Sequence, residues 1–203
     1  MRYATAVRRL RTIAESCDRA SRLWDQPVLA GGYVFGDVLD GAADLPVVQV
    51  AFVLECPAQD VTWLALPPHS AGIADLLDLE KAPVEWFWRP AAWPVWNHLI
   101  RGPVRFWSPA GPDEHVLDCL EQRRFDGLPR LVPTAEDELN QLQVELDAAL
   151  AHLRDVDERY WDRDWRSVHK GLGQYPQDHL WRAVHGFLNL QAAVAARRPE
   201  RGD

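Results

Sequence analysis

Residues 47–54, with the sequence VVQVAFVL, limit the possible folds of this chain more than any other stretch. They are rich in β-branched residues and almost continuously apolar, which is typical of a strand buried on both faces. Hydrophobic residues make up 47% of the 203-residue chain, which is enough apolar material for a core. We therefore predict a buried strand here, within an α+β fold of one large or two small domains.

The rest of the first 130 residues alternates between helix and strand patterns. Residues 2–23 are expected to form an amphipathic helix, because apolar residues recur at steps of three and four. Its stripe consists of Val7, Leu10, Ile13, Ala14, Cys17 and Ala20, and its arginines Arg8, Arg9, Arg11 and Arg19 lie mostly outside it, as on a solvated face. Further strands are expected at 28–30, 61–66, 84–88 and 104–107, and further helices at 71–79 and 113–124.

The composition changes after a loop at 125–133. Thr134 and Asp137 have the spacing of a capping box, so a helix is expected from there to about Tyr160. A second helix is expected after Pro176, with a stripe of Leu180, Val184, Phe187, Leu188 and Ala192. Residues 162–175 are expected to connect the two helices, and the end, RRPERGD, to be a frayed tail. We predict an α/β domain over 1–130, with a small mixed sheet flanked by helices, and a helical bundle over 131–203.

Charge and cysteine content exclude several classes of protein. The net charge of −8 and the pI of about 5.3 argue against a broad electrostatic grip on nucleic acid. Three widely spaced cysteines without a CxxC pair favour neither a disulfide framework nor a zinc site. The first residues lack the apolar core of a signal peptide, and no apolar run is long enough for a membrane span. We therefore expect a cytoplasmic protein without a membrane partner.

The glycine-containing segment before residue 47 carries a family resemblance. Its sequence is Phe35-Gly36-Asp37-Val38-Leu39-Asp40-Gly41. With a preceding helix and short strand, a following buried strand and a helical C-terminal half, it resembles a minimal nucleotidyltransferase of the polymerase-β type. In that family the turn reads roughly Phe-Gly-Ser, with a second glycine five positions on, and the next strand carries Asp-x-Asp. The resemblance implies a sheet of nucleotidyltransferase-like type and a turn (Gly36, Asp37, Gly41) that binds nucleotide phosphates.

The chain departs from this family where the chemistry would occur. Asp37 replaces the serine, and Val48 and Val50 stand where the two metal-binding acids belong. A later strand offers Arg105 in place of the third acid. Phosphoryl transfer needs metal ions held on carboxylates, so these changes point away from catalysis. We predict no metal site and no cofactor; Mg²⁺ would be bound only in an enzyme with displaced acids, such as Asp37, Asp40 and Asp44.

The helical half adds a second implication. Minimal nucleotidyltransferases are often paired with HEPN-type helical domains, some of which are ribonucleases with an Arg-x(4–6)-His pair. Arg163 and His169 have this spacing, and such residues supply a cation and a general base. A coincidental match of this permissive spacing is the plainer interpretation.

Two further groups of residues are candidates for binding. Asp178, Arg182 and His185 share one helical face, which fits either a ligand-facing stripe or an ordinary Asp–Arg pair beside a histidine. The tryptophans Trp86, Trp88, Trp93, Trp96 and Trp107, with Arg89 and Arg105, are candidates for an aromatic pocket that stacks a base or small ligand. Tryptophans are more commonly core or interface residues, and the chain has ten, which favours a dimer or partner face.

These patterns lead to one functional prediction and two alternatives. We predict a catalytically degenerate nucleotidyltransferase-like protein that acts as a binding or regulatory module, for which the resemblance implies an antitoxin-like or defence-associated role. The first alternative is an active nucleotidyltransferase or HEPN-like ribonuclease with displaced catalytic residues. The second is an α+β domain that only dimerises. A protein partner or self-association is expected, a nucleotide ligand is possible, and the residue usage suggests a bacterial source.

Overall fold

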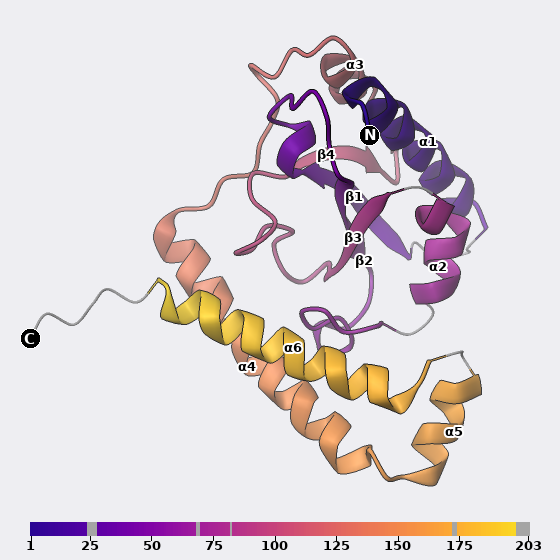
Figure 1. Ribbon diagram of the computed structural model, residues 1–203, viewed down its shortest axis with the longest axis vertical. Coiled ribbons are helices and arrows are strands. Elements are labelled where there is room, and N and C mark those ends of the chain that lie inside the picture. Colours follow the sequence, from indigo (N-terminus) through magenta and orange to yellow (C-terminus); the bar gives the residue numbers. More distant parts are fainter. Residues whose placement is uncertain (24–27, 68–69, 82, 172–173, 198–203) are drawn as a thin grey trace, which may run out of the picture. The chain divides into compact units, whose positions relative to one another are not determined.

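The structure is a computed structural model that describes residues 1–23, 28–67, 70–81, 83–171 and 174–197. The chain forms two compact units. We call the first, residues 1–57 with 69–132, the sheet unit, and the second, residues 58–68 with 133–203, the helical unit. The segment 58–68 therefore lies within the chain of the sheet unit but belongs to the helical unit (Figure 1).

The described part of the sheet unit contains a mixed five-stranded sheet and three α-helices. Its strands are β1 (Leu29–Phe35), β2 (Val48–Leu54), β3 (Val84–Pro90), β4 (Val104–Ser108) and β5 (Gly111–Pro112), in the order β3-β2-β1-β4-β5. Among the strands of the described residues, only the pair β2–β3 is parallel. The helices are α1 (Tyr3–Ser21), α2 (Ser70–Leu76) and α3 (Glu114–Glu121), with 3-10 turns η1 (Gly36–Val38) and η3 (Leu79–Lys81). The α+β class with a mixed sheet and C-terminal helices is confirmed.

Strand β2 is as buried as its sequence predicts. We call the side of the sheet that carries Val48, Val50 and Phe52 the core face, and all three side chains are fully buried. The ring of Phe52 lies 5.6 Å from that of Trp88 and 6.4 Å from that of Phe106, centroid to centroid. On the other side of β2, Ala51 is also buried, and Gln49 near the start of the strand is half-buried. The β-branched run therefore forms the second strand from one edge and packs on both sides.

Helix α1 closes this core with the stripe that its periodicity predicts. Leu10, Ile13, Ala14 and Cys17 are fully buried, and α1 contacts β1, β4 and α3. Burial raises the pKa of the Cys17 thiol, because a thiolate is poorly solvated there. Cys17 is thus a small apolar core residue rather than a reactive one.

Strand β1 is longer than predicted. A short strand at 28–30 ending in glycines was expected, but β1 continues through Gly31 and Gly32 to Phe35. A Cβ atom on Gly32 would lie 2.9 Å from the ring of Phe106, so the missing side chain makes room for an aromatic ring. The glycines therefore reflect close packing within the strand, not its end.

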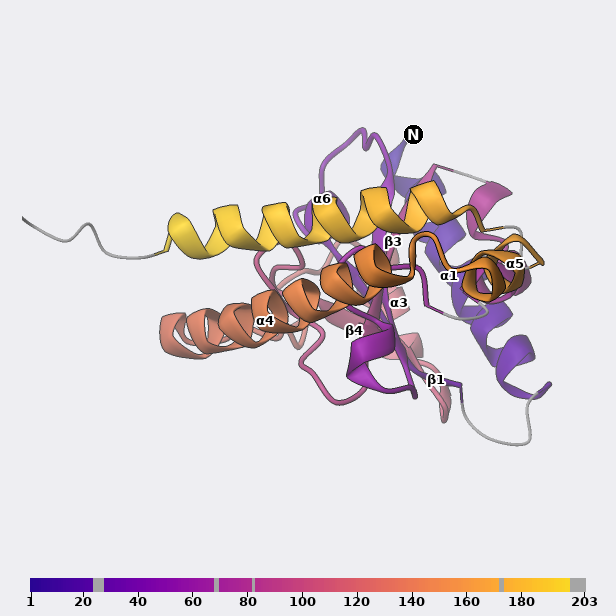
Figure 2. The same cartoon turned by 90° about the horizontal axis from the view of Figure 1, so that it is seen from below.

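The helical unit is built around a long antiparallel helix pair. Helices α4 (Ala135–Arg159) and α6 (Pro176–Ala195) run side by side, and α5 (Arg163–Gly171) lies between them in the chain (Figures 1 and 2). The predicted capping box is confirmed: Thr134 Oγ1 accepts a hydrogen bond from the Asp137 backbone N–H at 3.1 Å. The predicted connection at 162–175 was wrong in one respect, because most of it forms α5.

The strand predicted at 61–66 is wrong. After a 3-10 turn η2 (Ala58–Asp60), these residues form a loop in which Leu64 has a φ of 61°. Val61 and Trp63 are buried, and the indole Nε1 of Trp63 donates to Asn189 Oδ1 of α6 at 2.7 Å. The apolar run therefore packs on a helix instead of joining the sheet.

The predicted apolar stripe of α6 is also displaced. Val184, Leu188 and Ala192 were expected to be buried, but they are exposed. The buried face consists instead of Pro176, His179, Ala183, Gly186, Leu190 and Val194. Gly186 is required there, because a Cβ atom would lie 2.1 Å from the carbonyl oxygen of Trp63. Close packing requires small residues on this face, so a pattern of large hydrophobic residues does not predict that this face is the buried one.

Two further predictions concern the chain ends and membranes. Most of the expected frayed tail, residues 198–203, lies outside the described residues. Among the helices of the described ranges, none is long and apolar enough to cross a membrane.

Candidate functional site

The glycine turn of the sheet unit depends on both of its glycines. Gly36 and Gly41 have φ values of 72° and 69°, in the left-handed region that disfavours a Cβ atom. A Cβ atom on Gly36 would lie 2.0 Å from Gln49 Oε1, and one on Gly41 would lie 2.7 Å from the ring of Phe125. The side chain of Gln49 therefore occupies the space over Gly36. Both glycines have a conformational reason to be present, whether or not the turn binds a ligand.

The two valines at the expected acid positions lie inside the protein. Val48 and Val50 belong to the core face and have no exposed area. Side chains alternate along a strand, so Gln49 lies on the opposite side of the sheet, together with the turn. Asp37, at the serine position, is exposed in η1.

The side of the sheet opposite the core face carries two pairs of polar side chains, which are offset along the strands because Gln49 pairs with Phe35 and Tyr33 with Ala51. We call Tyr33, Gln49, Glu85 and Arg105 the polar sheet patch. The strand registers Gln49↔Glu85 and Tyr33↔Arg105 place these residues on one side, and Gln49 Nε2 donates to Glu85 Oε2 at 2.7 Å. Four adjacent strands span about 14 Å, which is the size of a nucleotide-like ligand.

A small cavity adjoins this patch. Its volume is about 130 Å³, and it is lined by Tyr33, Arg105, Asp113, Pro129 and Leu131. Asp113 is fixed as the N-cap of α3, where Oδ1 accepts from the Val116 backbone N–H at 3.1 Å. The cavity thus presents an aromatic ring, a guanidinium group and a carboxylate. Only Arg105 among these residues was a candidate from the sequence; Tyr33 carries no local motif and becomes a candidate through its register with Arg105.

The structure brings one pair of the aromatic-pocket candidates together, since the guanidinium carbon of Arg89 lies 5.9 Å from the centroid of the Trp93 ring, and it separates others. Trp88 packs against Phe52 on the core face, whereas Arg89 and Arg105 lie on the other side of the sheet. Trp86 alternates with its neighbours onto the side of Trp88 and is half-buried. Arg89 is fully buried, and its Nη2 donates to the Pro94 carbonyl at 2.9 Å.

The helical unit contains a cluster that was not foreseen. We call Trp165, His169, Gln174 and His179 the histidine cluster. The imidazole centroids of His169 and His179 lie 4.4 Å apart, and Trp165 lies 4.1 Å from His169. His179 Nε2 is 3.1 Å from Gln174 Oε1, and His169 Nδ1 is 2.7 Å from the Trp165 carbonyl oxygen. Because a carbonyl only accepts, each of these ring nitrogens donates, and His169 Nε2 is the acceptor of the neutral ring.

Burial dominates the electrostatics of this cluster. Burial, followed by the nearby His169 and His152, lowers the pKa of His179 to about 4. Burial also lowers the pKa of His152 on α4. His179 is therefore neutral at pH 7. The sequence gives no sign of this, because the cluster joins residues from two helices.

The Arg163–His169 pair does not converge. The two residues are six positions apart on α5, which separates their side chains by about 120° around the helix axis. Arg163 is exposed, whereas His169 faces His179. Arg166 is the better-fixed cation: it donates to the Tyr160 carbonyl at 3.0 Å and lies 5.4 Å from the centroid of the Tyr160 ring.

The predicted stripe on α6 lies mostly on its surface. Asp178 and His185 are exposed and Arg182 is half-buried. The His185 ring packs on that of Trp181 at a tilt of 42°, with centroids 4.2 Å apart. Arg182 lowers and Asp178 raises the pKa of His179, so these two residues act on His179 in opposite directions.

The acids of the glycine turn do not form a metal site. Asp40 lies 3.5 Å from Arg130 in an ion pair, and Asp44 is bridged through its backbone to Arg2. Within the described ranges, no group of three or more His, Cys, Asp or Glu residues is arranged to hold a metal ion.

Comparison with known proteins places the chain in a family. No curated protein and no solved structure matches the chain. One family model, described as a domain of unknown function (DUF7711), matches residues 1–196. Since the match covers nearly the whole chain, the protein belongs to the DUF7711 family.

Proposed function

We propose that this chain is a binding or regulatory module: a nucleotidyltransferase-like sheet unit without metal-dependent chemistry, fused to a HEPN-like helical unit. The order of elements supports the first half of this proposal. A helix, a strand, a glycine turn and a second strand follow one another, and β3 then runs parallel to β2. The antiparallel α4–α6 pair with the shorter α5 supports the second half.

The chemistry of the sheet beside the glycine turn carries the proposal. Metal-dependent transfer needs carboxylates on β2, but Val48 and Val50 lie in the core. The side chain nearest the turn is Gln49, an uncharged amide that is hydrogen-bonded to Glu85. An amide beside one carboxylate suits recognition of a ligand through hydrogen bonds rather than activation of a phosphate.

Tyr33 and Arg105 indicate the kind of ligand. An aromatic ring stacks on a nucleobase, and a planar guanidinium group binds a phosphate through two donors or stacks on a ring. The cavity beside both residues holds about 130 Å³, so it accepts part of a ligand that extends along the polar sheet patch. We therefore infer that a nucleotide is the ligand, with regulation of a protein partner as the outcome.

Binding is tested with ¹⁵N-labelled protein and a panel of nucleoside mono-, di- and triphosphates. Chemical-shift changes are expected at Tyr33, Gln49 and Arg105, and binding is expected to be at least about tenfold weaker in Arg105→Ala. Arg101→Ala is the matched control, because Arg101 is exposed on a nearby loop and donates to the His98 carbonyl. Equal weakening by both substitutions, or no shifts with any nucleotide, would contradict this site.

The absence of chemistry is tested separately. The protein is incubated with each α-labelled nucleoside triphosphate, Mg²⁺ or Mn²⁺, and a cell extract. No transfer of label to protein or RNA is expected. Transfer by the wild type that disappears in Asp37→Ala would show that displaced acids support catalysis, and it would refute the proposal.

One observation favours a second candidate, a HEPN-like ribonuclease with displaced groups. The Nδ1–H of His169 is held by the Trp165 carbonyl, which directs Nε2 to act as a proton acceptor, as a general base requires. In this case RNA cleavage would be lost in His169→Gln and retained in Arg163→Ala. Absence of cleavage by the wild type would dismiss this candidate.

A further inference from the structure

Helix α6 carries a second apolar face, on the side away from its buried residues. All members of this face are exposed, and they are Trp181, Val184, Leu188, Ala192 and Ala195. They recur at steps of three and four positions, so they form one stripe along the helix. Trp181 is 59% exposed and Leu188 is 51% exposed. We call this stripe the outer face of α6.

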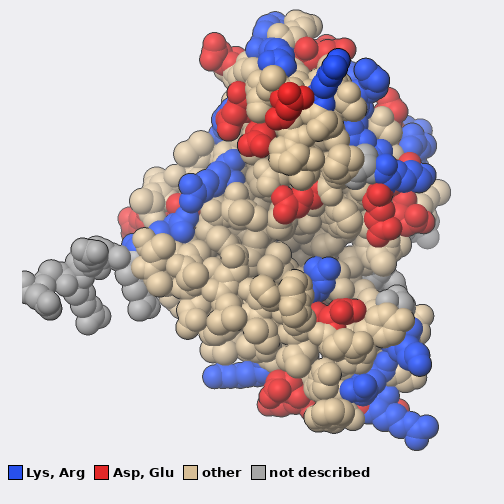
Figure 3. All heavy atoms as spheres, viewed as in Figure 1, with Lys and Arg blue, Asp and Glu red and all other residues tan. Residues whose placement is uncertain are grey.

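Most of the outer face lies in a stretch of sequence without charge. Residues 183–196 contain no Asp, Glu, Lys or Arg, although charged residues make up 26% of the chain. In Figure 3 the surface along α6, which crosses the lower half of the view, is tan over most of the helix. A helix on the surface of a protein normally carries charged residues on its solvent side. The composition of α6 is therefore that of a helix covered on both sides.

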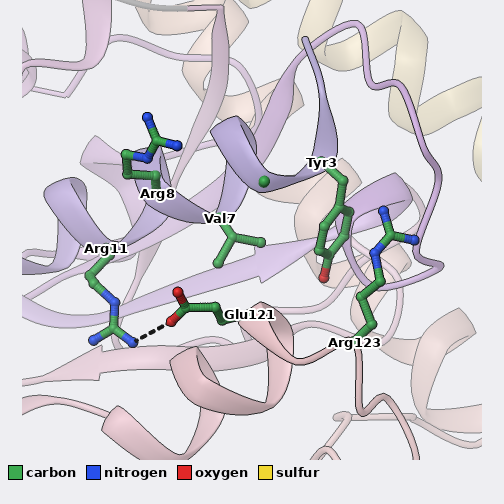
Figure 4. A pocket seen from close by; sticks show the side chains of 7 residues that line it. Tyr3, Val7, Arg8, Arg11, Glu121 and Arg123 are labelled. Carbon is green, nitrogen blue, oxygen red and sulfur yellow. Dashed lines mark hydrogen bonds and ion pairs between the residues drawn. The ribbon is translucent and has the colours of Figure 1, made fainter.

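The helical surface of the sheet unit differs in this respect. Basic and acidic side chains are intermixed around α1 and α3 in Figure 3. A cavity of about 240 Å³ beside these helices is lined by Arg8, Arg11 and Arg123, and Figure 4 shows the ion pair of Arg11 with Glu121. Charged residues are depleted in the cores of protein interfaces, because their desolvation is costly. The outer face of α6 is therefore better suited to a protein contact than this surface is.

The charge of the chain indicates a second copy as the occupant of the outer face. Each copy has a net charge of −8, so two copies repel one another where their charged surfaces meet. A contact through the outer face avoids this repulsion. The stretch from Val184 to Ala195 also offers no cation that would attract a nucleic acid or an anionic lipid.

The outer face is also complementary to itself. In an antiparallel pair with a two-fold axis at Leu188, a residue before Leu188 faces the residue equally far after Leu188 in the second copy. Trp181 then faces the partner's Ala195, and Val184 faces the partner's Ala192. Each large side chain meets a small one, so the two helices can approach closely. A parallel pair would instead place each residue beside its own copy, tryptophan on tryptophan and alanine on alanine.

We propose that the protein forms a homodimer through the outer face of α6, with the two α6 helices antiparallel and Leu188 on the two-fold axis. The face extends over about 21 Å of the helix, from Trp181 to Ala195. The proposal is independent of nucleotide binding, because no residue of the polar sheet patch belongs to this face.

Light scattering of the wild type and three variants tests the interface. The wild type is expected to have twice the 23.1 kDa mass of one chain. Val184→Glu places a carboxylate against the partner's Ala192 and should reduce the mass to that of one chain. Val168→Glu is the matched control, because Val168 is exposed on α5 and lies outside the outer face, and this variant should remain a dimer. Adding Ala192→Lys to Val184→Glu supplies the opposite charge at the facing position, so the double variant should dimerise again.

Cross-linking tests the antiparallel arrangement. In Leu188→Cys the two introduced thiols lie side by side on the two-fold axis, so mild oxidation should produce a disulfide-linked dimer. In Trp181→Cys they are about 21 Å apart along the helices, so no such dimer should form. The wild type is the control, because Cys17 and Cys119 are buried and Cys56 is half-buried. Leu188→Cys remains informative if Val184→Glu unfolds.

Three results would contradict the proposal. A wild type that is monomeric at every concentration at which it is soluble, or a dimer that persists in folded Val184→Glu, would overturn the interface. A dimer that is lost in Val184→Glu but does not link through Leu188→Cys would overturn the antiparallel arrangement. A monomer that sediments with vesicles of neutral phospholipid would assign the outer face to a membrane and overturn the homodimer as well.

Discussion

The neutral state of His179 makes the stability of the helical unit depend on pH. His179 is 6% exposed, and its pKa is lowered from 6.5 to about 4 in the folded protein. Between these two values the unfolded chain binds more protons than the folded chain. The contribution of neutral His179 to stability is therefore fully present above about pH 6.5 and is lost as the pH falls toward 4.

The two pKa values set the size of this loss. At pH 5 an unfolded histidine is almost fully protonated and His179 is mostly neutral, which corresponds to about 2 kcal/mol relative to pH 8. The complete shift corresponds to about 3 kcal/mol. Since a domain of ordinary stability unfolds with about 5–15 kcal/mol, the effect is large enough to measure.

Urea denaturation at pH 8 and pH 5 measures the effect. The free energy of unfolding of the wild type should differ between pH 8 and pH 5. This difference is expected to be smaller by about 2 kcal/mol in His179→Gln, whose side chain does not titrate. His185→Gln is the control, because His185 is exposed on the same helix and its replacement should leave the difference unchanged. The reasoning is refuted if His179→Gln retains the wild-type difference, or if the His179 ring titrates near pH 6.5 in an NMR experiment.

Three further substitutions test the packing and the surfaces of the helical unit. Gly186→Ala places a Cβ atom 2.1 Å from the Trp63 carbonyl oxygen, so it should destabilise the protein by about 1–3 kcal/mol. Gly171→Ala is the control, because a Cβ atom there would have nothing within 4 Å, and it should not destabilise the protein. Thermal denaturation compares the two variants. Thr134→Ala removes the capping box and should cost about 1 kcal/mol, measured against the exposed Ser167→Ala. If the exposed residues Trp181, Val184 and Leu188 mediate self-association, Leu188→Glu should shift the mass measured by light scattering to that of a monomer, and Gln191→Glu should not.

Local periodicity predicts two kinds of element. In the first, one side of a helix is buried; in the second, a continuous apolar run forms a buried strand. The stripe of α1, the strand β2 and the capped start of α4 are of these kinds. Their sequences contain the signal because the pattern and the environment coincide.

The same signal is misleading where a distant partner decides the structure. Residues 61–66 have the composition of a strand, but Trp63 is hydrogen-bonded to Asn189, which is 126 positions away in the sequence. In α6, Ala183 and Gly186 are buried for their small size, while the larger Val184 and Leu188 are exposed. His169 and His179 are in contact because α5 and α6 pack together, and neither helix carries a sequence motif that predicts this contact.

The assignment of residues 58–68 to the helical unit makes the two units topologically inseparable. The chain enters the helical unit after residue 57, returns to the sheet unit, and enters it again after residue 132. A gene fragment that begins at residue 133 would produce α6 without the Trp63 backbone that covers Gly186. During synthesis, the same loop leaves the ribosome long before the helix it packs on, so the helical unit completes its fold only after the last helix has emerged. Recombination would therefore have to transfer both units as one piece.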